Sequence, residues 1–219
     1  MLQPRWQTTS VGQRAGDEWP APVQRVRRGL DALRPAVFLD RDGTLNEEVD
    51  YLHKPEDLVL IPGAAEAVAR LNAAGIPVVV VTNQSGIGRG YYDWRDFSAV
   101  MSRMGTLLAL ENAHLDAVYV SPHHEKGQGD YAVADHADRK PNPGMLRRAA
   151  EEHGLDLARS WMVGDKDIDV QAGHRAGCRA CMVRTGYGTS HDPGGAEHVA
   201  DSLPHAVDHI LAGWPWPSR

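Results

Sequence analysis

The stretch AVFLDRDGTLNEEVDY, residues 36–51, places two aspartates, Asp40 and Asp42, directly after a short apolar run. A run of this length without polar alternation is typical of a strand that is covered on both faces of a parallel sheet. Two carboxylates one residue apart repel each other, and a turn needs only one of them. The stretch therefore predicts a buried strand that ends in an acidic site, and this site requires a counter-charge.

Four further short apolar runs follow along the chain, and stretches with helical periodicity separate most of them. The runs cover residues 77–81, 117–120, 161–164 and 180–183, and the helical patterns cover 63–75, 94–113 and 142–154. Apolar runs that alternate with helical patterns are typical of βαβ units. The sequence therefore predicts an α/β fold with a single Rossmann-like, doubly wound parallel sheet of about five strands.

These runs divide the chain into one folded domain and two ends. The domain is predicted for residues 35–212. Residues 1–34 are rich in Arg, Gln, Gly and Pro and show little strand pattern, which favours a partly irregular N-terminal extension. Residues 213–219, GWPWPSR, are expected to form an irregular tail.

Composition excludes several classes of function. The formal net charge of −6 leaves no basic footprint for nucleic acid. The longest apolar run, IPVVVV, is too short to span a bilayer, and the N-terminus lacks the apolar region of a secretory signal. Cys178 and Cys181 form a C-x-x-C that leads into a predicted strand, so we interpret them as small apolar residues. A cytoplasmic monomer with no membrane or nucleic-acid partner is expected.

Polar side chains follow each of the main predicted strands. Asp40 and Asp42 follow the first, Thr82 the second and Asp165 the fourth, and Lys140 precedes a helix between the third and the fourth. In a parallel sheet these segments meet at one edge, where ligands of such folds bind. Three carboxylates from Asp40, Asp42 and Asp165 form an all-oxygen donor set, which suits Mg²⁺ better than zinc.

This set of residues suits phosphoryl transfer. An aspartate can attack phosphorus and form an aspartyl-phosphate, and a second can protonate the leaving oxygen and then take a proton from water. The transferred group requires cationic and oriented donors, which Lys140, Thr82 and the amides around Gly43 can supply. Each motif alone also fits a turn or a helix cap. Their occurrence in order at successive strand ends indicates a site.

The motifs D-x-D-G-T, T-N, K and G-D-x-x-x-D resemble those of the haloacid dehalogenase-like superfamily of aspartate-nucleophile phosphatases. The longer stretches FLDRDGTLNEE, VTNQSGIGRGYY, SPHHEKG, RKPNPGM and VGDKDIDVQAG are similar to its histidinol-phosphatase and D,D-heptose 1,7-bisphosphate phosphatase branch. The resemblance covers about residues 36–188. It implies a phosphatase domain without a cap, and the short segments between residue 40 and the helix at 63 agree with this.

The resemblance also implies roles for individual residues. Asp40 would be the nucleophile and Asp42 the general acid and base, with Mg²⁺ held by Asp40, Asp165 and the backbone carbonyl of Asp42. Thr82 and Lys140 would stabilise the transferred phosphoryl group. The remaining residues implied at the substrate site are Asp50, Tyr51, Asn83, Gln84, Ser85, Arg89, Arg139 and Lys166.

One loop departs from the pattern of this branch, whose members usually carry a zinc loop of Cys-x-His followed by Cys-x-Cys. Ser121 stands at the position of the first cysteine, and His123 is retained. His136 and Asp138 replace the two later cysteines. His123, His136 and Asp138 can still form a three-ligand Zn²⁺ site, although structural zinc sites favour thiolates and four ligands. The alternative is a loop held by hydrogen bonds.

Three functions remain open at this stage. The first is a Mg²⁺-dependent phosphatase that converts D-glycero-D-manno-heptose 1,7-bisphosphate to heptose 1-phosphate, with Arg89, Arg139 and Lys166 as anchors for the second phosphate. The second is hydrolysis of histidinol phosphate or another sugar phosphate, and the acidic residues around Asp50 would suit the cationic histidinol. The third is a silent phosphate-binding module, which predicts the loss of a catalytic residue, and none is lost.

Overall fold

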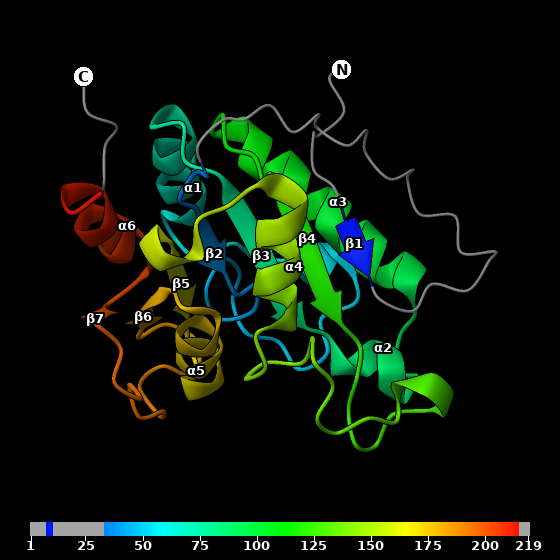
Figure 1. Cartoon of the computed structure of the whole chain (residues 1–219). Helices are drawn as coiled ribbons and strands as arrows, with labels where there is room; N and C mark the ends of the chain where they lie inside the picture. The colour runs from blue at the N-terminus through cyan, green and yellow to red at the C-terminus, as the bar shows by residue number, and fades with distance from the viewer. Residues whose placement is uncertain (1–7, 11–32, 215–219) are drawn as a thin grey trace.

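A parallel sheet of seven strands forms the centre of the structure, a computed structural model that describes residues 8–10 and 33–214 (Figure 1). The strand order is β1-β4-β3-β2-β5-β6-β7. The strands are β1 (Thr8–Ser10), β2 (Val37–Leu39), β3 (Val78–Asn83), β4 (Ala117–Ser121), β5 (Trp161–Gly164), β6 (Arg179–Val183) and β7 (His198–Ala200). All neighbouring pairs are parallel, as the α/β pattern predicts.

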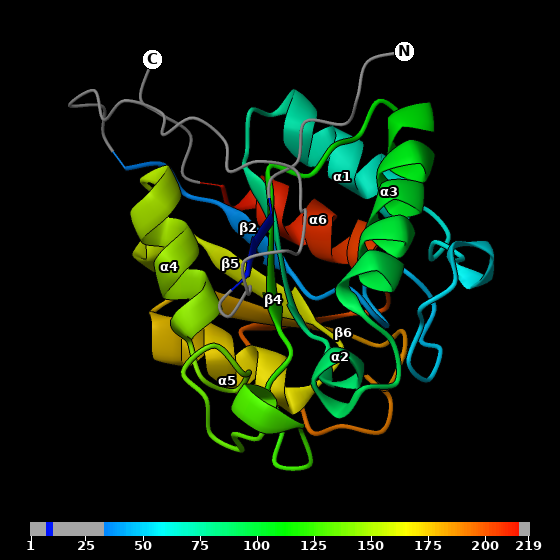
Figure 2. The ribbon, with the colours of Figure 1, turned by 90° about the vertical axis from the view of Figure 1, so that its right-hand side faces the viewer.

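Helices cover both faces of the sheet, which Figure 2 shows nearly edge-on. On one face lie α1 (Ala64–Ala73), α3 (Trp94–Leu110) and α6 (Leu203–Ala212), and on the other lie α4 (Gly144–His153) and α5 (Asp167–Ala176). In β2, Val37 and Leu39 pack into the first layer, whereas Phe38 packs into the second. This two-sided burial is the physical reason why the strands are apolar throughout.

Four short helical elements complete the described chain. They are α2 (Ser85–Arg89) and the 3-10 turns η1 (Pro55–Asp57), η2 (Gly129–Tyr131) and η3 (Leu157–Arg159). In α3, a capping box joins Asp93 and Asp96 at the first turn. This helix ends at Leu110, three residues before the predicted end, and Asn112 has a positive φ of 57°. No separate cap domain is present within residues 33–214.

The structure contains all five predicted strands and adds two. One addition is β1, which pairs with β4. It lies within residues 1–34, the segment predicted as an extension with little strand pattern. The other is β7, which pairs with β6 at the opposite edge. Both are three residues long and lie at sheet edges, where no continuous apolar run is required. Residues 1–7, 11–32 and 215–219 lie outside the described part, so the extension and the tail are otherwise untested.

Two smaller predictions can be checked in the same structure. Cys178 and Cys181 are free and buried, and burial raises the pKa of each thiol to about 12, as expected for small apolar residues. None of the helices in the described ranges is both long and apolar enough to cross a membrane.

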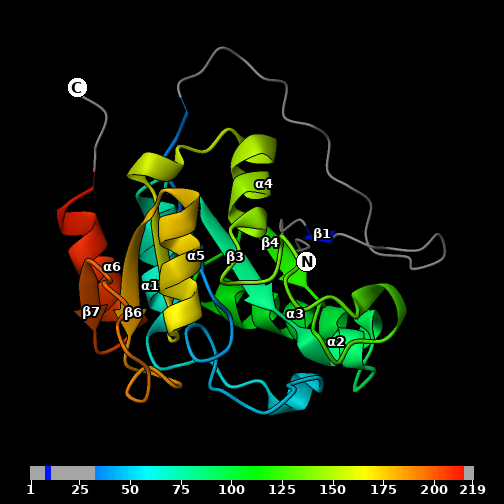
Figure 3. The same cartoon turned by 60° about the horizontal axis from the view of Figure 1, so that its bottom comes forward.

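The central strand β2 marks the point where the chain changes direction within the sheet. The chain continues from β2 to β3 and β4 on one side, and later returns to β5 on the other. In open α/β sheets, ligands bind in the crevice at the carboxyl ends of the strands beside such a point. Figure 3 brings this edge forward and shows the segments after β2 and β6 lying there together.

Candidate active site

A pocket of about 220 Å³ opens at the carboxyl end of β2. Its walls come from segments that are far apart in the sequence, as the parallel topology predicts. The sequence-predicted residues in its wall are Asp40, Asp42, Asp50, Tyr51, Thr82, Asn83, Gln84, Ser85, Lys140 and Lys166. Glu48, one of the acidic residues considered for a cationic substrate, lines it as well, and Arg41, Tyr92 and Tyr187 line it without having been predicted there.

Asp40 is held by a buried lysine at the base of this pocket. The Lys140 ammonium lies 2.8 Å from Asp40 and 2.7 Å from Asp169, and its side chain is 1% exposed. Burial raises the pKa of Asp40, although Lys140 opposes this effect. For Lys140, burial lowers the pKa, but the two carboxylates outweigh it and the pKa is raised. Lys140 therefore stays charged and supplies the counter-charge predicted for the acidic site after residues 36–39.

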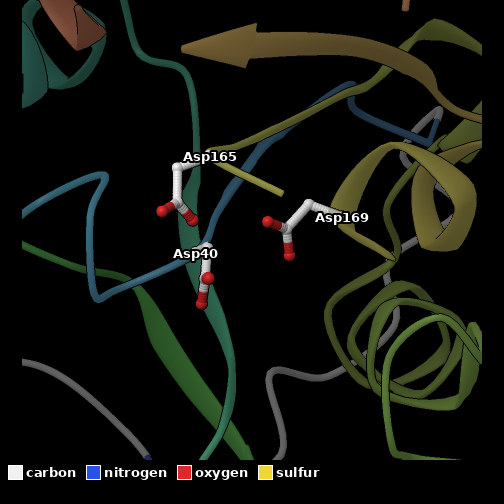
Figure 4. A group of neighbouring side chains, drawn as sticks. All are labelled: Asp40, Asp165 and Asp169. Carbon is white, nitrogen blue, oxygen red and sulfur yellow. The ribbon is translucent and has the colours of Figure 1, made fainter. Parts of the chain in front are cut away.

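Asp165 adds a further carboxylate to this cluster. Asp40, Asp165 and Asp169 offer oxygen atoms that all lie within 4.8 Å of one another (Figure 4). One oxygen of Asp165 accepts a hydrogen bond from the Tyr187 amide at 2.8 Å, and the other is buried without a partner. Burial, followed by the charge of Asp40, raises the pKa of Asp165 to about 7. The unpartnered oxygen indicates that a cation belongs beside it.

The donor set fits Mg²⁺, which prefers oxygen ligands and carboxylates. Asp40 and Asp165 are the two carboxylates that the resemblance implies for the ion, and Asp169 completes the group of three. The carboxylate of Asp42 is not part of the group, so any contribution of Asp42 would come from its backbone carbonyl, as the resemblance implies.

Five hydrogen bonds from two side-chain amides and a guanidinium hold the Asp42 carboxylate. Arg41 donates from Nε at 3.0 Å and from Nη2 at 2.8 Å, and Asn46 and Gln84 donate at 3.0 and 2.8 Å. Burial by itself would raise the pKa of Asp42, but Arg41 and these donors lower it below its usual range. Asp42 and Asp40 thus have opposite environments although one residue separates them.

Asn83 and Gln84 support neighbouring groups. Asn83 exchanges two hydrogen bonds of 3.0 Å with the backbone of Lys140, and this fixes the lysine to the end of β3. The Gln84 amide bridges Asp42 and Thr82, donating to the Thr82 hydroxyl at 2.9 Å. Both residues were predicted at the substrate site, and both line the pocket with their side chains already engaged.

Three predicted cations occupy different places. Lys166 lines the pocket and pairs with Glu48 at 3.0 Å. Arg89 does not line it; its guanidinium lies over the Tyr51 and Tyr91 rings and donates to both phenol groups. Arg139 is also absent from the lining and donates to the His123 carbonyl at 2.8 Å. Lys166 is therefore the predicted anchor with direct access to the pocket.

The loop between β4 and α4 brings the three candidate zinc ligands near one another without a metal-like arrangement. His123 and His136 stack face to face, with ring centroids 3.5 Å apart. Asp138 pairs with Arg148 at 3.0 Å, and its oxygen lies 3.9 Å from His136. Within residues 8–10 and 33–214, the one group of three side chains close enough to hold a metal is the aspartate group at the pocket.

Sequence reasoning missed two contributors to the site. Asp169 lies in the quoted motif GDKDID, but nothing in the sequence shows that its side chain reaches Lys140. The loop after β6 carries no motif, yet the Thr185 hydroxyl donates to the Gly43 carbonyl at 2.6 Å and the Tyr187 amide holds Asp165. Only the order of the strands, which places β6 beside β5, brings this loop to the site.

Replacing Gly186 by alanine is expected to damage the site through crowding. A Cβ at Gly186 would overlap the Asp165 carboxylate and lie 2.6 Å from the Cα of Gly43. Displacement of Asp165 should weaken Mg²⁺ binding and lower kcat/KM by about 100-fold, the usual cost of misplacing a reacting group by ~1 Å. Steady-state phosphate release over a Mg²⁺ titration measures both effects.

Gly129 provides a matched control for backbone strain. Its φ of 53° is close to the 56° of Gly186, but a Cβ there meets nothing within 4 Å. Gly129→Ala should therefore reproduce the cost of the conformation without the crowding. Equal losses of activity in the two variants would contradict the proposed contact with Asp165.

The Asp40–Lys140 pair lies at the carboxyl edge of a parallel sheet, beside carboxylates that can hold Mg²⁺. This combination of fold and site is that of a phosphatase. Comparison with known proteins leads to the same class. The family described as "Haloacid dehalogenase-like hydrolase" matches residues 37–93, and the family described as "HAD-hyrolase-like" matches residues 137–206.

Relatives and a solved structure extend this comparison. A D-glycero-D-manno-heptose-1,7-bisphosphate 7-phosphatase of Thermosynechococcus vestitus is 48% identical over 81% of this chain and 95% of its own. A D-glycero-beta-D-manno-heptose-1,7-bisphosphate 7-phosphatase of Haemophilus influenzae is 41% identical over 78% and 94%. The crystal structure of D,D-heptose 1,7-bisphosphate phosphatase from B. bronchiseptica, complexed with magnesium and phosphate, covers 81% of this chain and 98% of its own, at 36% identity and a TM-score of 0.73. The chain belongs to the haloacid dehalogenase-like hydrolases.

Proposed function

We propose that the protein hydrolyses the 7-phosphate of D-glycero-D-manno-heptose 1,7-bisphosphate in a Mg²⁺-dependent reaction. The observation that carries this proposal is the Asp40–Lys140 pair at 2.8 Å in the wall of the pocket. The relatives at 41–48% identity, which carry this activity in their names, supply the substrate. The products are inorganic phosphate and the heptose 1-phosphate.

The reaction proceeds in two steps on Asp40. Its carboxylate attacks the phosphorus, the bond to the sugar oxygen breaks, and Asp42, in the protonated form that the second step regenerates, gives that oxygen a proton and becomes a carboxylate. Water then attacks the aspartyl-phosphate, Asp42 takes a proton from it, and the phosphorus–carboxylate bond breaks to release phosphate. Lys140 neutralises Asp40 and the transferred group, and Thr82 donates to a phosphoryl oxygen.

A bound Mg²⁺ neutralises charge on the phosphoryl oxygens and on the carboxylates. Asp40 and Asp165 would hold it, together with the Asp42 carbonyl. Lys166 is the anchor proposed for the distal phosphate because it lines the pocket and stays charged. Burial alone would lower the pKa of Lys166, but Asp165 and other carboxylates raise it.

Mg²⁺ binding is expected to tighten as the pH rises from 5 to 7. Without the metal, the pKa of Asp165 is raised to about 7, so between about pH 4 and 7 the folded state holds a proton that the unfolded chain, with the ordinary aspartate pKa of 3.8, has lost. This contribution to stability is present below pH 4 and is lost as the pH rises through 7. Mg²⁺ must displace the proton, so its apparent Kd should fall about tenfold per pH unit below 7 and level off above.

Thermal-shift titrations with MgCl₂ at pH 5, 6, 7 and 8 measure this dependence. The increase in Tm at a fixed Mg²⁺ concentration should be larger at pH 8 than at pH 5. Asp165→Asn removes the titrating group and should flatten the dependence while weakening binding. The same Kd at pH 5 and pH 8 in the unchanged protein would show that Asp165 does not exchange a proton for the metal.

The substrate is tested by comparing kcat/KM for heptose 1,7-bisphosphate, histidinol phosphate and fructose 1,6-bisphosphate. Asp50 and Glu48 both line the pocket, but Glu48 is paired with Lys166, whose ammonium suits a second phosphate better than a cationic group. The bisphosphate should therefore be preferred by at least about tenfold, which corresponds to ~1.4 kcal/mol of binding to the second phosphate. Equal values, or a preference for histidinol phosphate, would refute the heptose substrate.

Zinc in the loop between β4 and α4 is a further possibility, and the geometry supports the alternative of a zinc-free loop. Arg148 already neutralises Asp138, and the two histidine rings stack instead of converging on a point. Metal analysis of the purified protein should find less than one zinc per ten chains; stoichiometric zinc would contradict this. The monomeric state and the cytoplasmic location stay predictions from the sequence.

A further inference from the structure

Arg41, the residue between the two catalytic aspartates, is buried although it carries a charge. Its side chain is 1% exposed, and its guanidinium lies over the Phe97 ring of α3 at 5.5 Å. Buried arginines require a carboxylate partner, because the guanidinium cannot lose its charge. Here the partner is the adjacent Asp42, which receives Nε and Nη2 of the same guanidinium.

The guanidinium holds Asp42 in a defined orientation. Nε and Nη2 both donate to Oδ1, at 3.0 and 2.8 Å, and Nη2 also lies 2.8 Å from Oδ2. A fork of this kind fixes the plane of the carboxylate as well as its position. The Asp42 side chain is nevertheless 15% exposed and lines the pocket, so it is held from one side and accessible from the other.

A second side chain, that of Gln84 between β3 and α2, fixes the same carboxylate. Gln84 donates to Asp42 Oδ2 at 2.8 Å and to the Thr82 hydroxyl at 2.9 Å. The Tyr92 hydroxyl donates to Gln84 Oε1 at 2.5 Å, so the amide nitrogen of Gln84 must face Asp42. The Gln84 amide therefore holds both Asp42, which is proposed to transfer protons, and Thr82, which is proposed to bind phosphate.

We propose that Arg41 is a positioning residue that orients the Asp42 carboxylate for its two proton transfers. Gln84, itself held by Tyr92, orients the same carboxylate at Oδ2. The inference rests on the proposed function, in which Asp42 serves both the leaving oxygen and the attacking water. Proton transfer depends on hydrogen-bond distance and direction, so a carboxylate free to rotate is a weaker acid and base catalyst. Arg41 borders the pocket, but three of its hydrogen bonds go to Asp42, so its proposed action is through Asp42.

The test is Arg41→Lys, which keeps the charge and removes the planar fork. We expect kcat to fall about 10- to 100-fold with KM changed by less than about threefold, because an orientation needed only in the transition state is lost. Arg70→Lys is the matched control. Arg70 also pairs with an aspartate, Asp208 at 2.6 Å, but this pair is exposed and joins α1 to α6 away from the pocket.

A double-variant cycle with Asp42→Asn separates positioning from a general structural role. If Arg41 acts through Asp42, Arg41→Lys should change kcat less than about twofold once Asp42 is already Asn. Multiplicative losses in the double variant would overturn the proposal. Tyr92→Phe, which removes one hydroxyl, should give a smaller loss in the same direction that also disappears beside Asp42→Asn, and this variant serves if Arg41→Lys does not fold.

p-Nitrophenyl phosphate keeps this test independent of the natural substrate. Its leaving group is weakly basic and departs without a proton, whereas hydrolysis of the aspartyl-phosphate still needs Asp42 as a base. Arg41→Lys should therefore retain the initial burst of nitrophenol and slow the steady state that follows. Loss of the burst together with the steady state would overturn the proposal, whereas wild-type inactivity toward heptose bisphosphate alone would overturn only the proposed substrate.

Discussion

Asp40→Asn is expected to lower phosphate release by at least about 10⁴-fold, a loss typical of removing a catalytic nucleophile. An amide oxygen is a poor nucleophile and cannot form the aspartyl-phosphate. Lys140 keeps Asp169 as a partner at 2.7 Å, and burial already disfavours the charge of Asp40 by raising its pKa. The variant should therefore fold, with a free energy of unfolding within about 2 kcal/mol of the unchanged protein.

Phosphate release under saturating Mg²⁺ and mass spectrometry of the acid-quenched protein together measure this result. The unchanged protein should gain one phosphoryl group during turnover, and Asp40→Asn should gain none. Asp57→Asn is the matched control, since Asp57 is exposed in η1 and does not line the pocket. Residual activity above about 1% with a folded variant would contradict the role of Asp40 as nucleophile.

The sequence was sufficient for the parts of the molecule that obey a repeating physical rule. A strand buried on both faces must be apolar throughout, so β2 and β3 could be recognised from AVFL and PVVVV. Parallel strands point their carboxyl ends to one edge, so the convergence of Asp40, Thr82 and Asp165 followed from topology alone. The edge strands β1 and β7 were not predicted, because a strand at the edge of a sheet does not need a continuous apolar run.

Contacts between side chains were beyond the reach of sequence patterns. Asp169 pairs with Lys140 because α5 begins directly after β5 and turns that side chain back toward the site. Arg139 was expected at the substrate, and no sequence pattern indicated that its guanidinium also donates to the His123 carbonyl. Asn83 and Gln84 line the pocket as predicted, yet their hydrogen bonds go to Lys140 and Asp42. Each of these depends on a distance between distant segments, which spacing along the chain does not encode.

Lys140→Met is expected to impair stability and catalysis together. The substitution keeps most of the side-chain volume and removes the ammonium that lies between Asp40 and Asp169. Two buried carboxylates are then left without their partner, and breaking a buried ion pair in this way costs about 3–5 kcal/mol. Phosphate release should fall by about 10³-fold, since an electrostatic stabiliser of the transition state is lost.

Chemical denaturation at pH 5 and pH 8 tests the electrostatic origin of that instability. In the variant, Asp40 and Asp169 can escape repulsion only by taking up a proton, so the loss of stability should be larger at pH 8 than at pH 5. Adding Asp169→Asn removes one of the two charges and should restore part of the stability at pH 8 but none of the activity. Lys166→Met, which breaks the less deeply buried pair with Glu48, should cost less than Lys140→Met. A uniform loss at both pH values would instead mean that Lys140 stabilises the fold through packing of its methylene chain.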